Sequence, residues 1–322
     1  MKRETGWEVI GTALAVAVSV LMVALLSGCR ADGAERLRRE LEKAVEGVDA
    51  QVGIAVLSPS GESAAVNGGE DFPMMSVFKL HQALAVCDRL HGSGRSLNET
   101  VDIKAEDMVP ETYSPLKDRY PNGGITLSVA ELTEYTLKKS DNIACDILFD
   151  RIVSPEETDA FIREKAGIDG MKIRYNEAEM QADPMRAYEN SSTPTAAVRL
   201  LERLWKNEIL PEEQTAFIKK LMIECETGAA KLPAPLKESG ALIGHKTGSG
   251  YRLPDGRLSA CNDIGFVTLP DGRTYFIAVF IKDSALPDAE NDRLIADISA
   301  IAYRFFVSES DEAVAGDEAA AL

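Results

Sequence analysis

Histidine and basic residues are scarce in this sequence, and each shortage excludes a class of function. The 322 residues include three histidines, which are too few for a histidine-rich metal site. Lysine and arginine number 35 against 52 acidic residues, which gives a formal net charge of -17. Nucleic-acid binding needs a basic face that neutralises phosphates. We therefore expect no nucleic-acid partner and no metal, and an anionic substrate must be held by a few placed cations.

Cysteine is also sparse, with five residues that form neither a close-spaced disulfide framework nor a metal-binding cluster. Four of them lie in the body of the chain, at Cys87, Cys145, Cys225 and Cys261. Four cysteines allow three full pairings, and the sequence does not choose among them. Because cysteine is one of the residues most often buried, free buried thiols are the favoured interpretation.

The N-terminal residues have the character of a secretory signal. An apolar run over residues 10–26 follows a basic start and ends at Leu26-Ser27-Gly28-Cys29. This ending resembles a bacterial lipobox, whose processing leaves a lipid-bearing cysteine as the new first residue. We expect a lipoprotein signal peptide over residues 1–28 and a lipid on Cys29 that holds the protein on a membrane, in the periplasm or at the outer face of the cell envelope. An uncleaved membrane anchor is the alternative.

Hydrophobic patterning predicts an α+β fold, in which helices flank an antiparallel sheet and an all-helical lobe is inserted into it. Strands are predicted at Gln51–Ser58, Gly61–Asn67, Gly244–Ser249, Asp263–Leu269 and Arg273–Lys282. Helices are predicted at 34–47, Val77–His91, Ser128–Lys139, Ile143–Ile152, Pro155–Ala166, Thr193–Asn207, Pro211–Glu224 and Asn291–Phe306. The lobes are predicted as 29–73 with 226–307 for the α/β lobe, 74–225 for the helical lobe, and 308–322 for a disordered acidic tail.

Three short strings, far apart in the chain, carry side chains suited to acyl transfer. Each alone is weak, since a Ser-x-x-Lys pattern arises by chance roughly once in a chain of this length. The strings are Ser76-Val77-Phe78-Lys79, Ser140-Asp141-Asn142 and Lys246-Thr247-Gly248. Similar strings occur at Ser114-Pro115-Leu116-Lys117, Ser96-Leu97-Asn98 and Lys165-Ala166-Gly167. Order, spacing and local structure favour the first set.

The first string suits a nucleophile at a helix start. Ser76 and Lys79 share a helix face, so the amine can reach the hydroxyl that it helps to deprotonate. A free backbone N–H at a helix start also points at charge that develops on an attacked carbonyl. An ordinary surface serine and lysine are the alternative. The competing string at Ser114 leads into several helix breakers, so we predict a loop there.

The other two strings suit substrate contacts. Ser140-Asp141-Asn142 lies between two predicted helices, where Asp or Asn most often caps the second helix, although a rigid turn can also aim Ser140 and Asn142 into a cleft. Lys246-Thr247-Gly248-Ser249 reads as a strand in which Gly248 lets a ligand approach the backbone closely. At a sheet edge it could pair with a substrate amide, while Lys246 and Thr247 bind a carboxylate. A solvated strand lysine is the alternative.

Together these strings resemble those of the class A serine β-lactamases, in the superfamily that includes penicillin-binding proteins. The resemblance spans residues 34–306 and implies hydrolysis of a small-molecule β-lactam through an acyl-serine, with no metal or organic cofactor. The roles that it implies are nucleophile for Ser76, proton transfer for Lys79, a proton shuttle for Ser140, amide binding for Asn142, and an oxyanion hole from the backbone N–H groups of Ser76 and Ser249.

The segment from Asn176 to Gln181 resembles the Ω-loop of that family and places Glu177 where the family keeps its deacylating base. A general base is worth about 10²–10⁴ in rate, enough to separate turnover from a trapped adduct. Glu179 is a second candidate, and an acidic surface loop is the plain alternative. The family usually has asparagine in place of Gln181 and arginine in place of Tyr175, so the resemblance does not fix water placement or loop closure. Gln181 is also expected to contact substrate.

Further substrate contacts are implied by the same resemblance. An arginine commonly assists carboxylate binding from the strand position that Cys261 occupies here, and we expect Lys231 to substitute for it. Tyr113 matches the aromatic residue that commonly flanks the family's site. With His245 before the lysine string, these features resemble the extended-spectrum and cephalosporinase branch of Bacteroidota. Cephalosporins and penicillins are the expected substrates, and the protein is expected to be a monomer.

Two other functions stay open at the level of the sequence. A penicillin-binding D-alanyl-D-alanine peptidase forms the same acyl-serine but releases it slowly. A non-catalytic β-lactam sensor stays acylated and signals through a partner. The lifetime of the penicilloyl adduct discriminates between these functions and hydrolysis.

Overall fold

The computed structural model describes residues 32–320 of the chain. The predicted signal segment 1–28 and the predicted lipidation site Cys29 lie outside the described residues. Within the described part, no helix is both long and apolar enough to cross a membrane.

A five-stranded antiparallel sheet joins the two ends of the described chain, as the patterning predicts. The strands are β1 (Gln51–Leu57), β2 (Ser63–Val66), β8 (Leu242–Ser249), β9 (Leu258–Thr268) and β10 (Thr274–Ser284). Their order is β2-β1-β10-β9-β8, so early and late strands pair and β8 forms an edge. The Lys246 string therefore lies on an edge strand.

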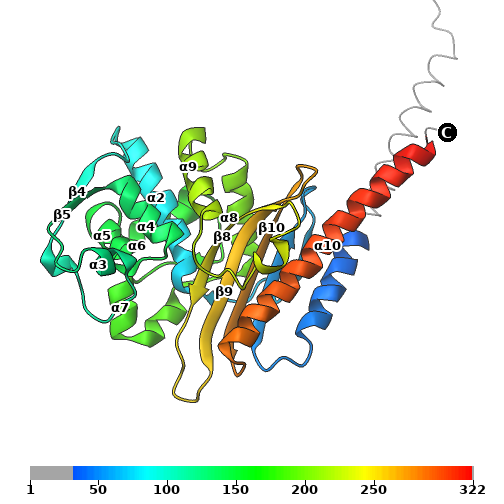
Figure 1. Ribbon diagram of the computed structural model, residues 1–322, viewed down its shortest axis with the longest axis horizontal. Helices are drawn as coiled ribbons and strands as arrows, with labels where there is room; N and C mark the ends of the chain where they lie inside the picture. The colour runs from blue at the N-terminus through cyan, green and yellow to red at the C-terminus, as the bar shows by residue number, and fades with distance from the viewer. Residues whose placement is uncertain (1–31, 321–322) are drawn as a thin grey trace, which may run out of the picture.

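Alternate residues of the central strands point to opposite faces of this sheet and enter two separate cores. Helices therefore cover both faces. In β1, Ile54 packs into one core and Ala55 into the other. The first core is closed by the helix over residues 32–45 and by α10 (Asp288–Ala320), which run side by side in Figure 1. The second core is shared with the helical lobe.

The helical lobe lies on the other side of the sheet and surrounds α2 (Phe78–Gly92), most of whose side chains are buried (Figure 1). Its other helices are α3 (Pro115–Arg119), α4 (Val129–Lys138), α5 (Asn142–Arg151), α6 (Pro155–Ala160), α7 (Glu177–Ala182), α8 (Pro194–Trp205) and α9 (Glu212–Ile223). Two small sheets tie its loops together, β3 (Phe72–Pro73) with β7 (Ser191–Ser192) and β6 (Met171–Lys172), and β4 (Thr100–Ile103) with β5 (Ile125–Ser128).

Two segments differ from the prediction. The string at Ser114, predicted as a loop, begins the short helix α3. Its side chain accepts the N–H of Lys117 at 3.0 Å, and Pro115 suits the first position of a helix, so these start signals outweigh the breakers that follow. The tail predicted to be disordered from residue 308 continues α10 to Ala320. The high helix propensity of alanine and glutamate favours this continuation.

Candidate active site

Ser76 lies in a single 3-10 turn, Met75–Val77, that leads directly into α2. The preceding Met75 has a φ of 46°, a left-handed value that is unfavourable for a residue with a side chain. Lys79 follows on the first turn of α2, and its Nζ lies 3.1 Å from Ser76 Oγ. The structure thus brings the predicted nucleophile and its predicted amine partner into hydrogen-bond contact at a helix start.

Lys79 is fully buried, and its side-chain nitrogen is surrounded by oxygen atoms from two other segments. It donates to the carbonyl oxygen of Ser140 at 2.8 Å and to Oδ1 of Asn142 at 2.6 Å. It also lies 2.9 Å from Oε1 of Glu177. These partners offset the cost of removing the charge from water. Lys79 therefore links the nucleophile, the α4–α5 turn and the Ω-loop.

Hydrogen bonds accepted by Asp141 fix the α4–α5 turn that contains Ser140. Ser140 itself has a left-handed φ of 58°. The next residue, Asp141, caps α5 by accepting the N–H of Ala144 at 2.9 Å, and it also accepts the hydroxyl of Ser114 and the N–H of Leu116. Burial raises the pKa of Asp141. The middle residue of the string is thus structural, while its neighbours face the cavity.

The edge strand β8 brings the third string to the same place. Lys246 Nζ donates to Oγ of Ser140 at 2.9 Å and to the carbonyl oxygen of Thr247 at 2.9 Å. Lys246 is fully buried, and this burial lowers its pKa to about 8. The lysine predicted to bind a carboxylate therefore also contacts the hydroxyl predicted to shuttle a proton.

Gly248 serves a purpose other than the predicted one. A Cβ atom at this position would lie 2.3 Å from the carbonyl oxygen of Met74. The space beside Gly248 is therefore filled by the segment that carries Ser76, and not kept for a ligand. Asn262 of β9, which the sequence analysis left without a role, strengthens this contact by donating to the carbonyls of Pro73 and Met74 at 2.8 and 3.1 Å.

Glu177 is the first residue of α7, and its backbone is held by a second residue without a predicted role. Asp146 of α5 accepts the N–H of Glu177 at 2.8 Å and the N–H of Ala178 at 2.9 Å. Burial, together with the nearby Glu177, raises the pKa of Asp146 to about 7. An acidic residue between the apolar residues of a buried helix was its sequence signal.

The geometry separates the two candidate bases. Glu177 Oε1 lies 3.4 Å from Oγ of Ser76. The carboxylate of Glu179 instead accepts the backbone N–H of Asn176 at 3.0 Å, while Asn176 Oδ1 accepts the N–H of Glu179 at 2.8 Å. This reciprocal capping box uses Glu179 to start α7. Only Glu177, of these two, is turned toward the serine.

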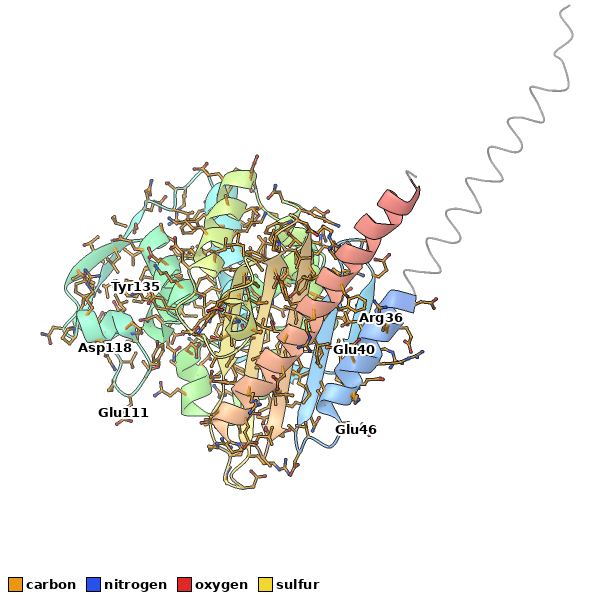
Figure 2. All side chains as sticks on the ribbon, turned by 45° about the vertical axis from the view of Figure 1, so that its right-hand side comes forward. Arg36, Glu40, Glu46, Glu111, Asp118 and Tyr135 are labelled. Atoms are coloured by element: carbon orange, nitrogen blue, oxygen red, sulfur yellow. The ribbon has the colours of Figure 1, made fainter. Side chains whose placement is uncertain are left out.

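A cavity of about 430 Å³ lies over these groups at the boundary between the helical lobe and the sheet. Its walls include Ser76, Ser140, Asn142, Glu177, Thr247 and Ser249. Tyr113, at 57% exposure, contributes to its rim. Gln181 also lines it and donates to the carbonyl of Glu111 at 2.8 Å. Figure 2 shows Glu111 on a loop at the edge of the helical lobe. Ser76, Ser140 and Glu177 therefore line this cavity, and the buried Lys79 contacts Ser76 and Glu177 from beneath it.

Lys231 lies beneath the cavity wall, with 4% of its surface exposed. Its Nζ lies 3.4 Å from Oγ of Ser249, 3.4 Å from the carbonyl oxygen of Asn262 and 3.8 Å from Oδ1 of Asp292. The thiol of Cys261 contacts the same Asp292 oxygen at 3.4 Å. Lys231 thus reaches the predicted carboxylate site through Ser249.

The four cysteines that the structure describes are free thiols, as the sequence analysis favours. Cys87, Cys145 and Cys261 are buried, whereas Cys225 is partly exposed. The described residues contain no group of three or more histidine, cysteine or acidic side chains placed to hold a metal ion.

Comparisons with known proteins give the same family. The model of a family described as "Beta-lactamase enzyme family" matches residues 35–306. A β-lactamase of Phocaeicola vulgatus is 37% identical over 275 residues, which cover 85% of this chain and 86% of the relative. The crystal structure of the TLA-3 extended-spectrum β-lactamase matches with a TM-score of 0.82 and 37% identity, over 85% of this chain and 99% of that one. A class A β-lactamase from Bacteroides cellulosilyticus matches with a TM-score of 0.81 and 35% identity, over 86% and 99%.

These matches confirm the predicted family and fold, and they favour the hydrolase over the peptidase and the sensor. The matched region contains every predicted catalytic residue. The chain belongs to the class A β-lactamase family and is a serine hydrolase of β-lactams.

Proposed function

We propose that Ser76 forms the acyl-enzyme and that Glu177 activates the water that releases it, so that cephalosporins and penicillins are turned over. One observation carries the proposal: Ser76 Oγ lies 3.1 Å from Lys79 Nζ and 3.4 Å from Glu177 Oε1. Lys79 Nζ lies 2.9 Å from the same carboxylate oxygen. A carboxylate beside both the nucleophile and its amine can act in both half-reactions.

In acylation, the oxygen of Ser76 attacks the β-lactam carbonyl carbon and its proton passes to the amine of Lys79. Glu177 has first taken a proton from the Lys79 ammonium, across their 2.9 Å contact. The carbonyl oxygen becomes an oxyanion, which the backbone N–H groups of Ser76 and Ser249 stabilise. The partial positive charge at the start of α2 adds to this stabilisation.

The ring nitrogen needs a proton when its bond to the carbonyl carbon breaks, and Ser140 supplies it. Lys246 returns a proton to Ser140 across their 2.9 Å hydrogen bond. Before deacylation, Glu177 releases to solvent the proton that it took in acylation, and Lys246 regains one from solvent, so both groups return to their starting forms. In deacylation, Glu177 takes a proton from water, whose oxygen attacks the acyl carbon, and passes that proton to the leaving oxygen of Ser76 across their 3.4 Å separation. The hydrogen bonds that the backbone N–H groups of Glu177 and Ala178 donate to Asp146 keep Glu177 in place during this step.

Substrate binding divides between the two walls of the cavity. The hydroxyls of Thr247 and Ser249 and the charge of Lys246 bind the substrate carboxylate, and Lys231 adds charge from beneath Ser249. Asn142, Gln181 and Tyr113, on the opposite wall and rim, contact the acylamino side. One structural relative is named an extended-spectrum β-lactamase, so cephalosporins with large side chains belong to the proposed substrates.

The location of the enzyme is part of this proposal. The apolar run over residues 10–26 and the ending at Cys29 support a lipid-anchored protein in the periplasm or at the outer face of the envelope. A monomer is the proposed active unit, because one chain brings Ser76, Lys79 and Glu177 into contact with one another.

The lifetime of the adduct tests the proposal. After a brief exposure to a penicillin or a cephalosporin, an acid quench and peptide mass mapping should place the acyl group on Ser76. With a good cephalosporin, the wild-type enzyme should carry little adduct during turnover. An adduct on Ser114, or none under any quench, contradicts the assignment of the nucleophile. An adduct that lasts many minutes with every substrate supports the peptidase or the sensor instead.

A further inference from the structure

Behind the carboxylate-binding wall, three side chains form a thiol–imidazole–carboxylate cluster, which we call the Cys225 cluster: Cys225, His245 and Asp263. Nδ1 of His245 lies 2.9 and 3.1 Å from the two carboxylate oxygens of Asp263. The side chain of Cys225, in the segment after α9, interacts with the charge of His245. His245 and Asp263 are buried, whereas the residue Cys225 as a whole is partly exposed.

The cluster activates its thiol. Burial opposes the charge of His245, but Asp263 and Cys225 together outweigh burial and raise the pKa of the imidazole. Burial alone would likewise raise the pKa of Cys225, but its interaction with charged His245 lowers that pKa to about 7. The thiolate is the nucleophilic form of cysteine. Burial raises the pKa of each of the other three described thiols, so Cys225 differs from them in both charge and access.

The charged groups around the thiol of Cys225 lie on β8, β9, α4 and the segment after α9. Besides the cluster itself they are Lys246 of β8, the flanking Glu224 and Glu226, and Lys138 of α4, which pairs with both glutamates. Lys246 adds to the attraction for a thiolate, while the glutamates are partly neutralised by Lys138.

The Cys225 cluster is connected to the substrate cavity by hydroxyl groups. Sγ of Cys225 lies 3.4 Å from Oγ1 of Thr227. Oγ1 of Thr227 lies 2.6 Å from Oγ1 of Thr247, and both threonines line the cavity. A group added to the sulfur on the side of Thr227 would displace the Thr227 hydroxyl, and Thr247 would then lose its partner.

We propose that Cys225 is a site of S-thiolation by small disulfides and thiosulfonates, and that an adduct there weakens substrate binding through Thr227 and Thr247. The second half rests on the proposed role of Thr247 in carboxylate binding, whereas the first half does not. In the reaction, the thiolate attacks a sulfur of the reagent, a new S–S bond forms, the S–S bond of the reagent breaks, and its other half leaves as an anion. No additional oxidant is needed.

Labelling with methyl methanethiosulfonate tests the first half, and mass mapping reads it without any need for hydrolysis. Native full-length protein should gain one methylthio group on Cys225 well before Cys87, Cys145 or Cys261, and mapping separates any label on Cys29. The labelling rate should rise with an inflection near pH 7, whereas an ordinary thiol titrates at about 8.5. The variant His245→Asn should shift this inflection upward. Equal labelling of the buried thiols, or no label on Cys225, overturns the proposal.

Hydrolysis kinetics test the second half. Labelled enzyme should show a KM for a cephalosporin raised about tenfold or more, with a smaller change in kcat, and dithiothreitol should reverse the effect. Cys225→Ser should be insensitive to the reagent, while the matched variant Cys261→Ser should stay sensitive. Labelled enzyme with unchanged kinetics overturns the coupling to the cavity. If the untreated enzyme turns over no β-lactam, the proposed function fails, and the labelling result stands by itself.

Discussion

The side chain of Asp146 holds Glu177 through the backbone N–H of Glu177, not through the side chain of Glu177. One carboxylate oxygen of Asp146 accepts the N–H of Glu177 at 2.8 Å, and the other accepts the N–H of Ala178 at 2.9 Å. Because Asp146 belongs to α5 in the core of the helical lobe, the first turn of α7 is fixed to the same body as Lys79. The side chain of Glu177 is left to face Ser76.

Replacing Glu177 by glutamine should stall the second half-reaction. The amide cannot take a proton from water, so deacylation should slow by about the 10²–10⁴ of a lost general base. Quenched-flow mass spectrometry should show the adduct accumulating on Ser76. Glu179→Gln is the matched control, since its carboxylate caps α7, and it should cost stability more than turnover. Normal turnover in Glu177→Gln with a stall in Glu179→Gln would reverse the choice of base.

The sequence predicts the strands, most of the helices and the contact between Ser76 and Lys79 well, because each depends on local periodicity. Alternating residues locate the strands, and their order makes the two ends of the chain share a sheet. Ser76 and Lys79 are three residues apart at a helix start, so their contact follows from helix geometry alone. Helical spacing does not place Lys246 beside Ser140. That contact was not predicted from the sequence.

What the sequence did not predict depends on tertiary contacts. Asp146 and Asn262 act on backbone groups far away in the chain, which no local pattern reveals. The space beside Gly248 is filled by Met74, so a glycine that suggests ligand access serves packing. The interaction between Cys225 and His245 joins two segments whose separation in sequence carries no signal.

Replacing Cys29 by alanine tests the proposed anchor. A diacylglycerol and a further acyl chain give stable membrane binding, whereas one signal alone gives reversible binding. The variant should appear in the soluble fraction or as an unprocessed precursor. Membrane fractionation with mass analysis of the N-terminus measures this. Unchanged membrane association of an unlipidated, intact N-terminus would support the uncleaved anchor.

His81 should make the fold sensitive to acid. It is fully buried behind Ser76, and burial lowers its pKa to about 4 from an ordinary 6.5. Between these values the unfolded chain binds more protons than the folded chain, so the free energy of unfolding falls as the pH falls. The loss is about 3 kcal/mol by pH 4, at about 1.4 kcal/mol for each unit of pKa.

The variant His81→Gln isolates this contribution, because the carboxylates titrate alike in both proteins. Urea unfolding at pH 7 and pH 4 should show a smaller loss of stability in the variant than in the wild type. An equal loss in the two proteins would contradict the assignment to His81.

Replacing Lys231 by alanine should raise KM more than it lowers kcat for substrates that carry a carboxylate. Its ammonium supports Ser249 at 3.4 Å, and the loss of a hydrogen bond to a charged group costs about 1.5–3 kcal/mol, or about 10–150-fold in kcat/KM. Lys231→Arg keeps the charge and should recover part of the loss. If the kinetics of every carboxylate-bearing β-lactam stay unchanged, Lys231 takes no part in binding.

The buried Lys246 should set the alkaline limit of activity. Burial lowers its pKa to about 8 from an ordinary 10.5, so the free enzyme loses this cation as the pH rises through 8. Both the attraction for the substrate carboxylate and the return of a proton to Ser140 need the cation. A plot of kcat/KM against pH should therefore fall above about pH 8, since this ratio reports groups of the free enzyme. Lys246→Arg stays charged throughout and should move the alkaline limb upward, even if its plateau is lower.

The same titration predicts the opposite trend for stability. Because the unfolded chain keeps the proton of Lys246 up to pH 10.5, the free energy of unfolding should gain a favourable contribution between pH 8 and 10.5 while activity falls. Activity and stability that fall together at pH 9 would assign the limit to unfolding instead of to Lys246.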